Sequence, residues 1–270
     1  MAPIPPEDIE THGHAGLLIG SQWSPPGAPT WVAVLVHGYG EHIGRYAWVA
    51  DRLTGDGAVV YGHDHLGHGR SEGERVLIED FEDVVADLHL LVQRAHEENP
   101  GLPLVLIGHS MGGMIAARYT QLHPEELSAT VLSGPVLHSW EPTALADLEE
   151  IPETPVDPST LSRDEGVGEA YTQDELVWHG SFKRPTLRAM SAAMAAIDEG
   201  GRLAVPTLYL HGEDDGLVPM GPSREGWERI AAADSHALTY PGARHEIFNE
   251  TNRDEVLGDV LDFVREHLSD

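Results

Sequence analysis

The sequence predicts an α/β fold: a mostly parallel central sheet with helices on both of its faces. Short, almost uninterrupted apolar runs alternate with amphipathic stretches along the chain. Such runs are typical of strands that are covered on both faces, as in a parallel sheet. The alternation of strands and helices also favours parallel pairing, because each helix returns the chain to the same end of the sheet. No run of about 18 apolar residues occurs, so we expect no membrane-spanning helix.

The predicted elements follow one another in this alternating order. Apolar residues repeat at intervals of three and four over residues 79–98, so this stretch is predicted to be a helix with one apolar face. Asn99-Pro100-Gly101 ends it. The same periodicity predicts two more helices, 112–122 and 253–268. Six apolar runs are predicted to be strands: 31–36, 58–61, 104–107, 130–132, 207–210 and 237–240.

Residues 137–190 interrupt this alternation, and we predict that they form a cap inserted into a core of residues 1–136 and 191–270. Between residues 138 and 182 there are eleven acids, four prolines and a single base, Arg163. Long insertions into compact domains are usually lids or binding loops. The alternative is a disordered acidic loop. Apolar side chains that could dock favour the cap: Leu145, Leu148, Ile151, Tyr171, Leu176 and Trp178.

Composition excludes several classes of function. The 270 residues include 45 acids against 16 lysines and arginines, which gives a formal net charge of −29. Nucleic acids and anionic membrane surfaces attract basic proteins, so neither is an expected partner. Cysteine is absent, which excludes disulfides and cysteine-based zinc sites. The start of the chain has neither the basic nor the apolar region of a signal peptide, so we expect a cytoplasmic protein.

A nucleophile motif follows the third predicted strand. Gly108-His109-Ser110-Met111-Gly112 fits the pattern G-x-S-x-G and leads directly into a predicted helix. In this context the turn presents the serine at the carboxyl end of the strand, and the two glycines avoid clashes around it. The N-terminus of the helix favours negative charge that develops beside the serine. Ser110 is therefore the predicted nucleophile; the alternative is a tight structural turn.

A serine nucleophile needs a general base and an acid that orients the base. Two adjacent aspartates, Asp214 and Asp215, follow strand 207–210. The pattern H-G-x-x-D-x-[LIV]-[VI], which is usual in α/β-hydrolases, selects Asp215 and leaves Asp214 as the alternative. His245 lies in the loop between the last strand and the last helix, where this order of residues places the base.

An oxyanion hole needs two backbone donors. One is the N–H of Met111, directly after the nucleophile. The other is expected in the loop after the first predicted strand, where Gly38 and Gly40 let the backbone approach the ester. The N–H of Tyr39 is the candidate there. The alternative is a simple glycine turn.

Residues 63–68, HDHLGH, approach the H-x-H-x-D-H motif of dinuclear zinc hydrolases. Gly67 stands where a metal-binding aspartate is required, and no distal set of ligands completes the site. Read from Asp64, the same stretch is close to the D-x-x-G-x-G-x-S loop that is common in α/β-hydrolases. We therefore predict a structural role for it, and no metal or cofactor.

Together these motifs resemble the monoacylglycerol lipases in the serine aminopeptidase S33, or hydrolase 4, group of the α/β-hydrolase superfamily. The most specific stretch is residues 37–46, HGYGEHIGRY, which is similar to the family pattern HGxGEHxxRY. DHLGHGRS, GHSMGG, HGEDDGLV and RHEIFNE follow, so the resemblance covers residues 12–268. It implies an α/β-hydrolase fold and hydrolysis of small neutral esters, above all monoacylglycerols, through an acyl-enzyme.

The resemblance also implies a substrate-binding role for three residues. Glu41 and Arg45 match positions that shape the glycerol end of the pocket and brace the oxyanion loop, and Tyr171 matches a cap tyrosine. The alternative for Arg45 is a surface ion pair with Glu41, four residues before it. The segment 139–160 is short, acidic and proline-rich, where relatives carry longer apolar helices. We therefore expect at most transient membrane contact through the cap.

Other functions compete with monoacylglycerol hydrolysis. Within hydrolases they are a short-chain or xenobiotic carboxylesterase, a lysophospholipase and a carbon–carbon bond hydrolase. Outside them, a non-catalytic binding protein on a hydrolase scaffold is disfavoured because Ser110, Asp215 and His245 are all in place. A peptidase is suggested only by the group name. The acidic cap favours neutral esters over anionic ones, because negative potential repels anions. The sequence leaves the oligomeric state open.

Overall fold

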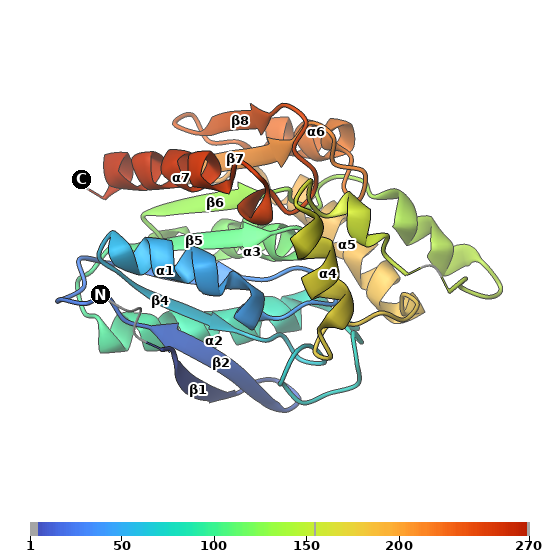
Figure 1. Cartoon of the computed structure of the whole chain (residues 1–270), viewed down its shortest axis with the longest axis horizontal. Coiled ribbons are helices and arrows are strands. Elements are labelled where there is room, and N and C mark those ends of the chain that lie inside the picture. Colours follow the sequence, from blue (N-terminus) through green and yellow to red (C-terminus); the bar gives the residue numbers. More distant parts are fainter. Residues whose placement is uncertain (1–4, 154, 269–270) are drawn as a thin grey trace.

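The computed structural model describes residues 5–153 and 155–268, and within them one eight-stranded sheet forms the centre of the molecule (Figure 1). The strands lie in the order β1-β2-β4-β3-β5-β6-β7-β8. Strands β3 to β8 pair in parallel, whereas β2 is antiparallel to both of its neighbours. The predicted α/β fold is confirmed. The strands are β1 (Glu7–His12), β2 (Leu17–Trp23), β3 (Trp31–Val36), β4 (Ala58–His63), β5 (Leu104–His109), β6 (Ala129–Ser133), β7 (Thr207–Gly212) and β8 (His236–Tyr240).

All six predicted strands are present, but β1 and β2 were not predicted. β1 lies at the edge of the sheet, and Ile9 is its only buried residue. A strand with one buried side chain has no apolar run, so it lacks the signal that marks the parallel strands. The alternating burial in β2 is the pattern that could have indicated it.

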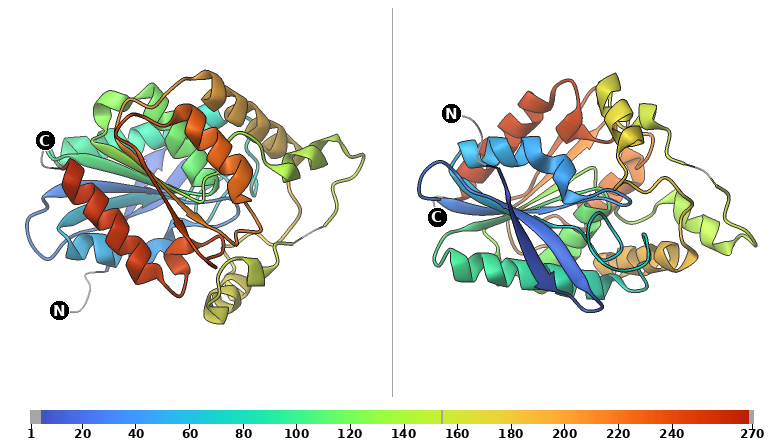
Figure 2. Two further views of the ribbon diagram at one scale, coloured as in Figure 1. Left: turned by 90° about the horizontal axis from the view of Figure 1, so that it is seen from above. Right: turned by 60° about the horizontal axis from the view of Figure 1, so that its bottom comes forward.

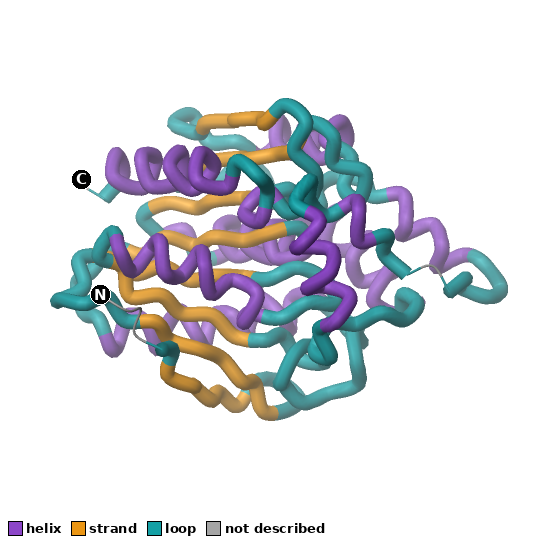
Figure 3. Tube along the Cα trace, in the orientation of Figure 1, coloured by secondary structure: helices purple, strands orange, loops and turns teal. Residues whose placement is uncertain are grey.

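Helices cover both faces of the sheet (Figures 2 and 3). Successive strand residues point to opposite faces: in β3, Val32 and Val34 belong to one core, and Ala33 and Leu35 to the other. Helices α2 (Phe81–Glu98), α3 (Met111–Leu122), α5 (Arg184–Glu199) and α6 (Met220–Ile230) build the first core; α1 (Ala47–Gly55) and α7 (Arg253–His267) build the second.

The helix predicted over 79–98 begins two residues later, at Phe81. Asp80 adopts an extended conformation and its carboxylate accepts a hydrogen bond from the Glu82 N–H at 3.0 Å. This contact satisfies an N–H group that has no partner within the helix, which makes Asp80 the N-cap.

Among the described residues, no helix combines the length and the apolar character that crossing a bilayer requires.

The strand order places the functional loops together. β3 has β4 on one side and β5 on the other, so the direction of winding reverses between β3 and β5. Crevices at such reversal points, beyond the carboxyl ends of the strands, are where ligands bind in open α/β sheets. The loop after β3 contains Tyr39, and Ser110 directly follows β5. The loops after β7 and β8 bring Asp215 and His245 to the same edge.

The connection from β6 to β7 extends beyond this edge of the sheet (Figure 2). It contains the short 3-10 helices Glu141–Asp147 and Pro158–Thr160, the helix α4 (Glu165–Gln173), and then α5. The boundary expected at residue 190 would divide α5, whose Met190 and Met194 pack in the core of the sheet.

The cap has a small core of its own. Leu161, Tyr171 and Val177 are buried against one another. Tyr171 was expected to dock, but Leu148, from the same expected set, is 45% exposed. The cap is also tied to the loop around His245: the Glu246 N–H donates to the Leu161 carbonyl at 2.8 Å.

Replacing Gly112 tests how closely the turn at Ser110 packs against the end of β3. A Cβ atom at Gly112 would lie 2.1 Å from the carbonyl oxygen of Val36, which is backbone and cannot move aside cheaply. We expect Gly112→Ala to lower the free energy of unfolding by about 3 kcal/mol, measured by urea denaturation. Gly258→Ala is the control, because Gly258 lies in α7 with no atom within 4 Å of the added carbon. It should raise stability by about 0.5–1 kcal/mol. Equal stability of the two variants would contradict the expected crowding at the turn.

Candidate active site

Ser110 occupies a strained turn between β5 and α3. Its φ is 57° and its ψ is −119°, a conformation that costs a residue with a side chain about 1–3 kcal/mol. The glycines on either side permit it. A Cβ at Gly108 would lie 2.2 Å from the Gly112 carbonyl oxygen, so no larger residue fits. The strain therefore serves to hold the hydroxyl at the base of the pocket, as the G-x-S-x-G pattern predicts.

The structure places Asp215, and not Asp214, beside His245. The Nδ1 atom of His245 lies 2.7 Å from Oδ2 of Asp215, and both side chains are buried. The other carboxylate oxygen of Asp215 accepts hydrogen bonds from the N–H groups of Leu217 and Val218, each at 2.9 Å. Asp214 is exposed. Two backbone donors thus fix the orientation of the carboxylate that faces the imidazole.

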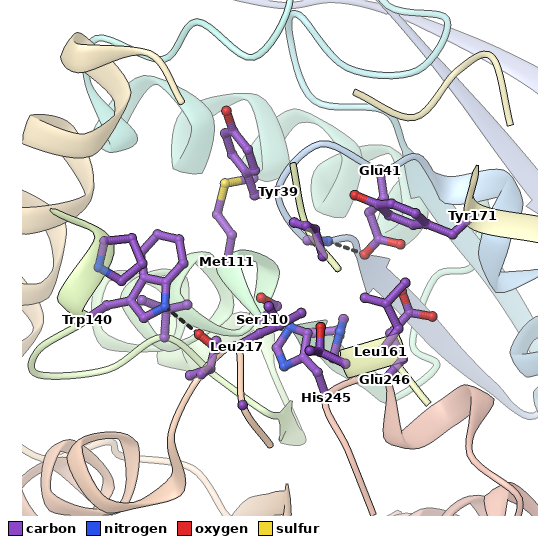
Figure 4. Close-up of a pocket in the computed structure, with 18 of the residues that line it drawn as sticks. Tyr39, Glu41, Ser110, Met111, Trp140, Leu161, Tyr171, Leu217, His245 and Glu246 are labelled. Atoms are coloured by element: carbon purple, nitrogen blue, oxygen red, sulfur yellow. Dashed lines mark hydrogen bonds between the residues drawn. The ribbon is translucent and has the colours of Figure 1, made fainter. Parts of the chain in front are cut away.

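Asp215 and His245 shift each other's pKa in opposite directions. Burial alone would lower the pKa of His245, but the Asp215 carboxylate outweighs burial and raises it above its ordinary value. Burial would raise the pKa of Asp215, and the neighbouring His245 and His211 instead lower it. Asp215 is therefore ionised near neutral pH and accepts the proton on Nδ1. This leaves Nε2 of His245 for the pocket, where Ser110 lies next to it (Figure 4).

The pocket has a volume of about 260 Å³ and two chemically different arms on either side of Ser110. Figure 4 shows Trp140, Met111 and Leu217 on one side of Ser110; on the other it shows Glu41, Tyr171 and Glu246, with Leu161 beside them. Further apolar side chains line the same pocket: Val136, Phe182, Met190 and Val218. Its aromatic wall comes from three segments, because the Phe182 ring contacts both Tyr39 and Trp140, with ring centroids 4.9 and 5.6 Å apart.

The polar arm is built around Arg45. Its guanidinium donates to Glu41 at 2.6 Å and to Glu246 at 2.9 Å, and its side chain is only 10% exposed. It also lies over the Tyr171 ring, 5.3 Å from the centroid. The ion pair between Arg45 and Glu41 therefore exists, but it is buried, so the alternative of a surface ion pair is wrong. Sequence reasoning missed Glu246, although an acid directly after the predicted base was a visible signal.

Glu41 also holds the loop after β3. Its Oε1 atom accepts from the Gly38 N–H and from the Tyr46 hydroxyl, both at 2.7 Å. Burial would raise the pKa of Glu41, but Arg45 and these donors outweigh it and lower the pKa, so the group is a carboxylate.

Two residues that line the pocket together with Ser110 have backbone N–H groups of interest, Tyr39 and Met111. Glu41 occupies the N–H of Gly38, while the N–H of Tyr39 has no partner among the described residues. The other N–H group is that of Met111 at the start of α3. A Cβ at Gly38 would lie 3.3 Å from the Ser110 Cβ, so glycine allows this loop to approach the serine closely.

The residues that approached a zinc motif serve the fold. Asp64 accepts from the Ile43 and Arg70 N–H groups at 2.7 and 2.8 Å, which closes the loop that follows β4. Within the described ranges, the only cluster with metal-ligand spacing is His89, His123 and Glu126, at the opposite end of α3 from Ser110. The two imidazoles are stacked, 4.2 Å apart and 14° from parallel. A metal lies in the plane of each imidazole that binds it, so this arrangement does not suit both rings.

The fold and this pocket define the α/β-hydrolase class: the nucleophile, acid and base positions follow β5, β7 and β8 in the order that the class uses. The chain belongs to the Hydrolase_4 family, described as serine aminopeptidase S33, whose model matches residues 27–252.

Relatives agree along nearly the whole chain. A monoacylglycerol lipase of Mycolicibacterium smegmatis is 38% identical over 272 residues, which cover 95% of this chain and 97% of that protein. Human monoglyceride lipase is 33% identical over 264 residues, covering 92% and 86%. The crystal structure of the Paleococcus ferrophilus monoacylglycerol lipase matches with a TM-score of 0.80 at 27% identity, covering 93% and 99%. The resemblance that the motifs predicted is thus confirmed.

The contact between Asp215 and His245 can be tested without any substrate. Asp215→Asn removes the carboxylate that opposes burial, so the pKa of His245 should fall below its wild-type value. The measurement is a pH titration of the His245 ring by NMR with labelled histidine. Asp214→Asn, which changes an exposed neighbour, should leave that titration unchanged. An equal effect of both substitutions would show that net charge, and not this contact, sets the pKa.

Proposed function

We propose that the protein hydrolyses carboxylic esters, with monoacylglycerols as its substrates, and that Ser110, His245 and Asp215 are its catalytic residues. One observation carries the proposal: Ser110 and His245 lie between an apolar and a polar arm of one pocket. A monoacylglycerol has the same division, with a hydrocarbon chain on one side of its ester and a diol on the other. The names of the relatives at 38% and 33% identity support this substrate class.

In the proposed mechanism, Ser110 Oγ attacks the ester carbonyl carbon while His245 Nε2 takes its proton. Asp215 keeps the proton on Nδ1 of His245 and stabilises the imidazolium that forms. The N–H groups of Tyr39 and Met111 stabilise the tetrahedral oxyanion. His245 then protonates the departing glycerol oxygen. Water attacks the acyl-enzyme with His245 as the base, which releases the fatty acid.

The two arms give the substrate its orientation. The acyl chain lies along the apolar arm, where burial of each CH₂ group contributes about 0.8 kcal/mol. The glycerol hydroxyls face Glu41, Arg45 and Tyr171, which offer both donors and acceptors. Because a single Arg45 lies between two carboxylates, Glu41 and Glu246, this arm keeps a surplus negative charge, so a neutral alcohol fits it better than an anionic headgroup does.

Ser110→Ala tests the chemistry. It should lower kcat on a monoacylglycerol by about 10⁴-fold or more and abolish labelling by a fluorophosphonate, because no other group supplies the nucleophile. Ser191→Ala, which changes an exposed serine on α5, is the matched control and should leave both unchanged. An unlabelled wild-type Ser110 would favour a non-catalytic binding protein.

A chain-length series of monoacylglycerols against p-nitrophenyl esters tests the substrate class: equal activity on both would make the protein a general esterase.

The cap acids predict selection against anionic substrates. Asp157 lines the pocket, and Glu149, Glu150 and Glu153 are exposed on the same segment. At low salt we expect kcat/KM for an ester whose acyl chain ends in a carboxylate to be about tenfold below that of its methyl-ester analogue. The difference should shrink as salt rises, because screening acts on the repulsion alone. A gap that is insensitive to salt would mean that pocket contacts, and not cap charge, distinguish the two esters.

A further inference from the structure

We propose that His37 is a positioning residue for the oxyanion hole: its ring holds the Gly38 carbonyl so that the N–H of Tyr39 points at the reacting ester. The inference rests on the proposed function, because it takes the Tyr39 N–H as an oxyanion donor. His37 follows β3 directly, is fully buried, and is not among the residues that line the pocket. It cannot touch the substrate and acts through the backbone.

The geometry of a single peptide unit carries the argument. The Nδ1 atom of His37 lies 2.8 Å from the Gly38 carbonyl oxygen. That oxygen and the N–H of Tyr39 belong to the same peptide, and in a planar trans peptide the two groups point in opposite directions. The His37 ring packs behind the loop, with its centroid 4.1 Å from that of His65. A carbonyl held on that side directs the Tyr39 N–H away from the His37 ring. Tyr39 and Ser110 both line the pocket, whereas His37 does not.

Contacts with His65 fix the proton that His37 needs for this role. The His65 backbone N–H donates to Nε2 of His37 at 3.0 Å, so Nε2 carries a lone pair and the proton lies on Nδ1. The Nε2 atom of His65 lies 3.1 Å from the His37 carbonyl oxygen. A carbonyl only accepts, so His65 carries its own proton on Nε2. His37 is thus a donor toward Gly38 in one defined tautomer.

The surroundings keep both rings neutral. Burial, with His68 and His63 as neighbours, lowers the pKa of His37 and His65 well below the usual histidine value. A second proton on His37 would place a donor on Nε2, facing the donor of His65. The neutral state is therefore the one in which the hydrogen bonds are satisfied.

Glu41 completes the control of the loop from the other side of Gly38. It accepts the Gly38 N–H at 2.7 Å, while His37 donates to the Gly38 carbonyl. Both polar groups of Gly38 are thus occupied, and the N–H of Tyr39 is left for the substrate. A role that is merely structural would give the same burial of His37. The two roles predict different effects of removing the ring. Loss of a positioning residue weakens binding of the transition state alone, whereas loss of a merely structural residue weakens binding of the substrate as well.

His37→Leu and His37→Asn separate these roles. Leucine removes the donor, so kcat should fall about 100-fold while KM changes little, as for the loss of one oxyanion donor. Asparagine can place its amide N–H near the position of Nδ1 and should restore kcat to within about tenfold of wild type. A trifluoromethyl ketone, which forms a tetrahedral adduct with the serine, should lose affinity in His37→Leu in step with kcat/KM. A monoalkylglycerol ether, which cannot react, should bind His37→Leu as it binds wild type.

Several results would overturn the proposal. Wild-type kcat in His37→Leu would do so, and so would equal loss of affinity for the ketone and the ether. If His37→Leu does not fold, ¹⁵N shifts of the wild-type ring decide, because the proposal requires the proton on Nδ1 and a proton on Nε2 excludes it. Ser110→Ala is measured alongside. Activity in Ser110→Ala would refute the proposed function, whereas an inactive Ser110→Ala beside a fully active His37→Leu would refute only the role of His37.

Discussion

The close approach of the Ser110 turn to the end of β3 is the constraint on which the rest of the site depends. Added Cβ atoms at Gly112 and Gly38 would meet the Val36 carbonyl at 2.1 Å and the Ser110 Cβ at 3.3 Å. No side chain separates the strained turn from the loop that follows β3. The parallel pairing of β3 with β5 sets this distance, so the sheet register itself brings Ser110 and the loop after β3 together.

Arg45 extends this constraint to the other loops. It joins Glu41 after β3 to Glu246 after β8, and its guanidinium covers the Tyr171 ring of the cap. A buried ion pair is costly to desolvate, and loss of one partner leaves an uncompensated charge. Because one cation pairs with two carboxylates here, the loop after β3 and the loop after β8 share a single anchor. We infer that the arrangement favours a fixed relation between the two loops over stability alone.

Patterns that are local in the chain predicted most of the fold and part of the site. Short apolar runs of three to six residues marked the parallel strands, and Ser110 and His245 could be placed because each follows or precedes a recognisable element. Asp215 needed the family pattern, since Asp214 has the same local environment in sequence. Contacts between residues far apart in the chain could not be predicted: Glu246 meets Arg45 across 201 positions, and His37 meets His65 across 28. Neither pairing follows from periodicity or from spacing.

The net charge of −29 acts at a different place from the chemistry. The acids nearest Ser110 are buried and have hydrogen-bonding partners: Asp215 faces His245, and Arg45 lies between Glu41 and Glu246. The cap acids Glu149, Glu150 and Glu153 are exposed and belong to neither set of contacts. Long-range repulsion in water changes how often a charged ligand reaches a pocket, while buried paired groups act inside it. The acidity of the chain therefore bears on which esters approach, and the buried pairs on whether the bound ester reacts.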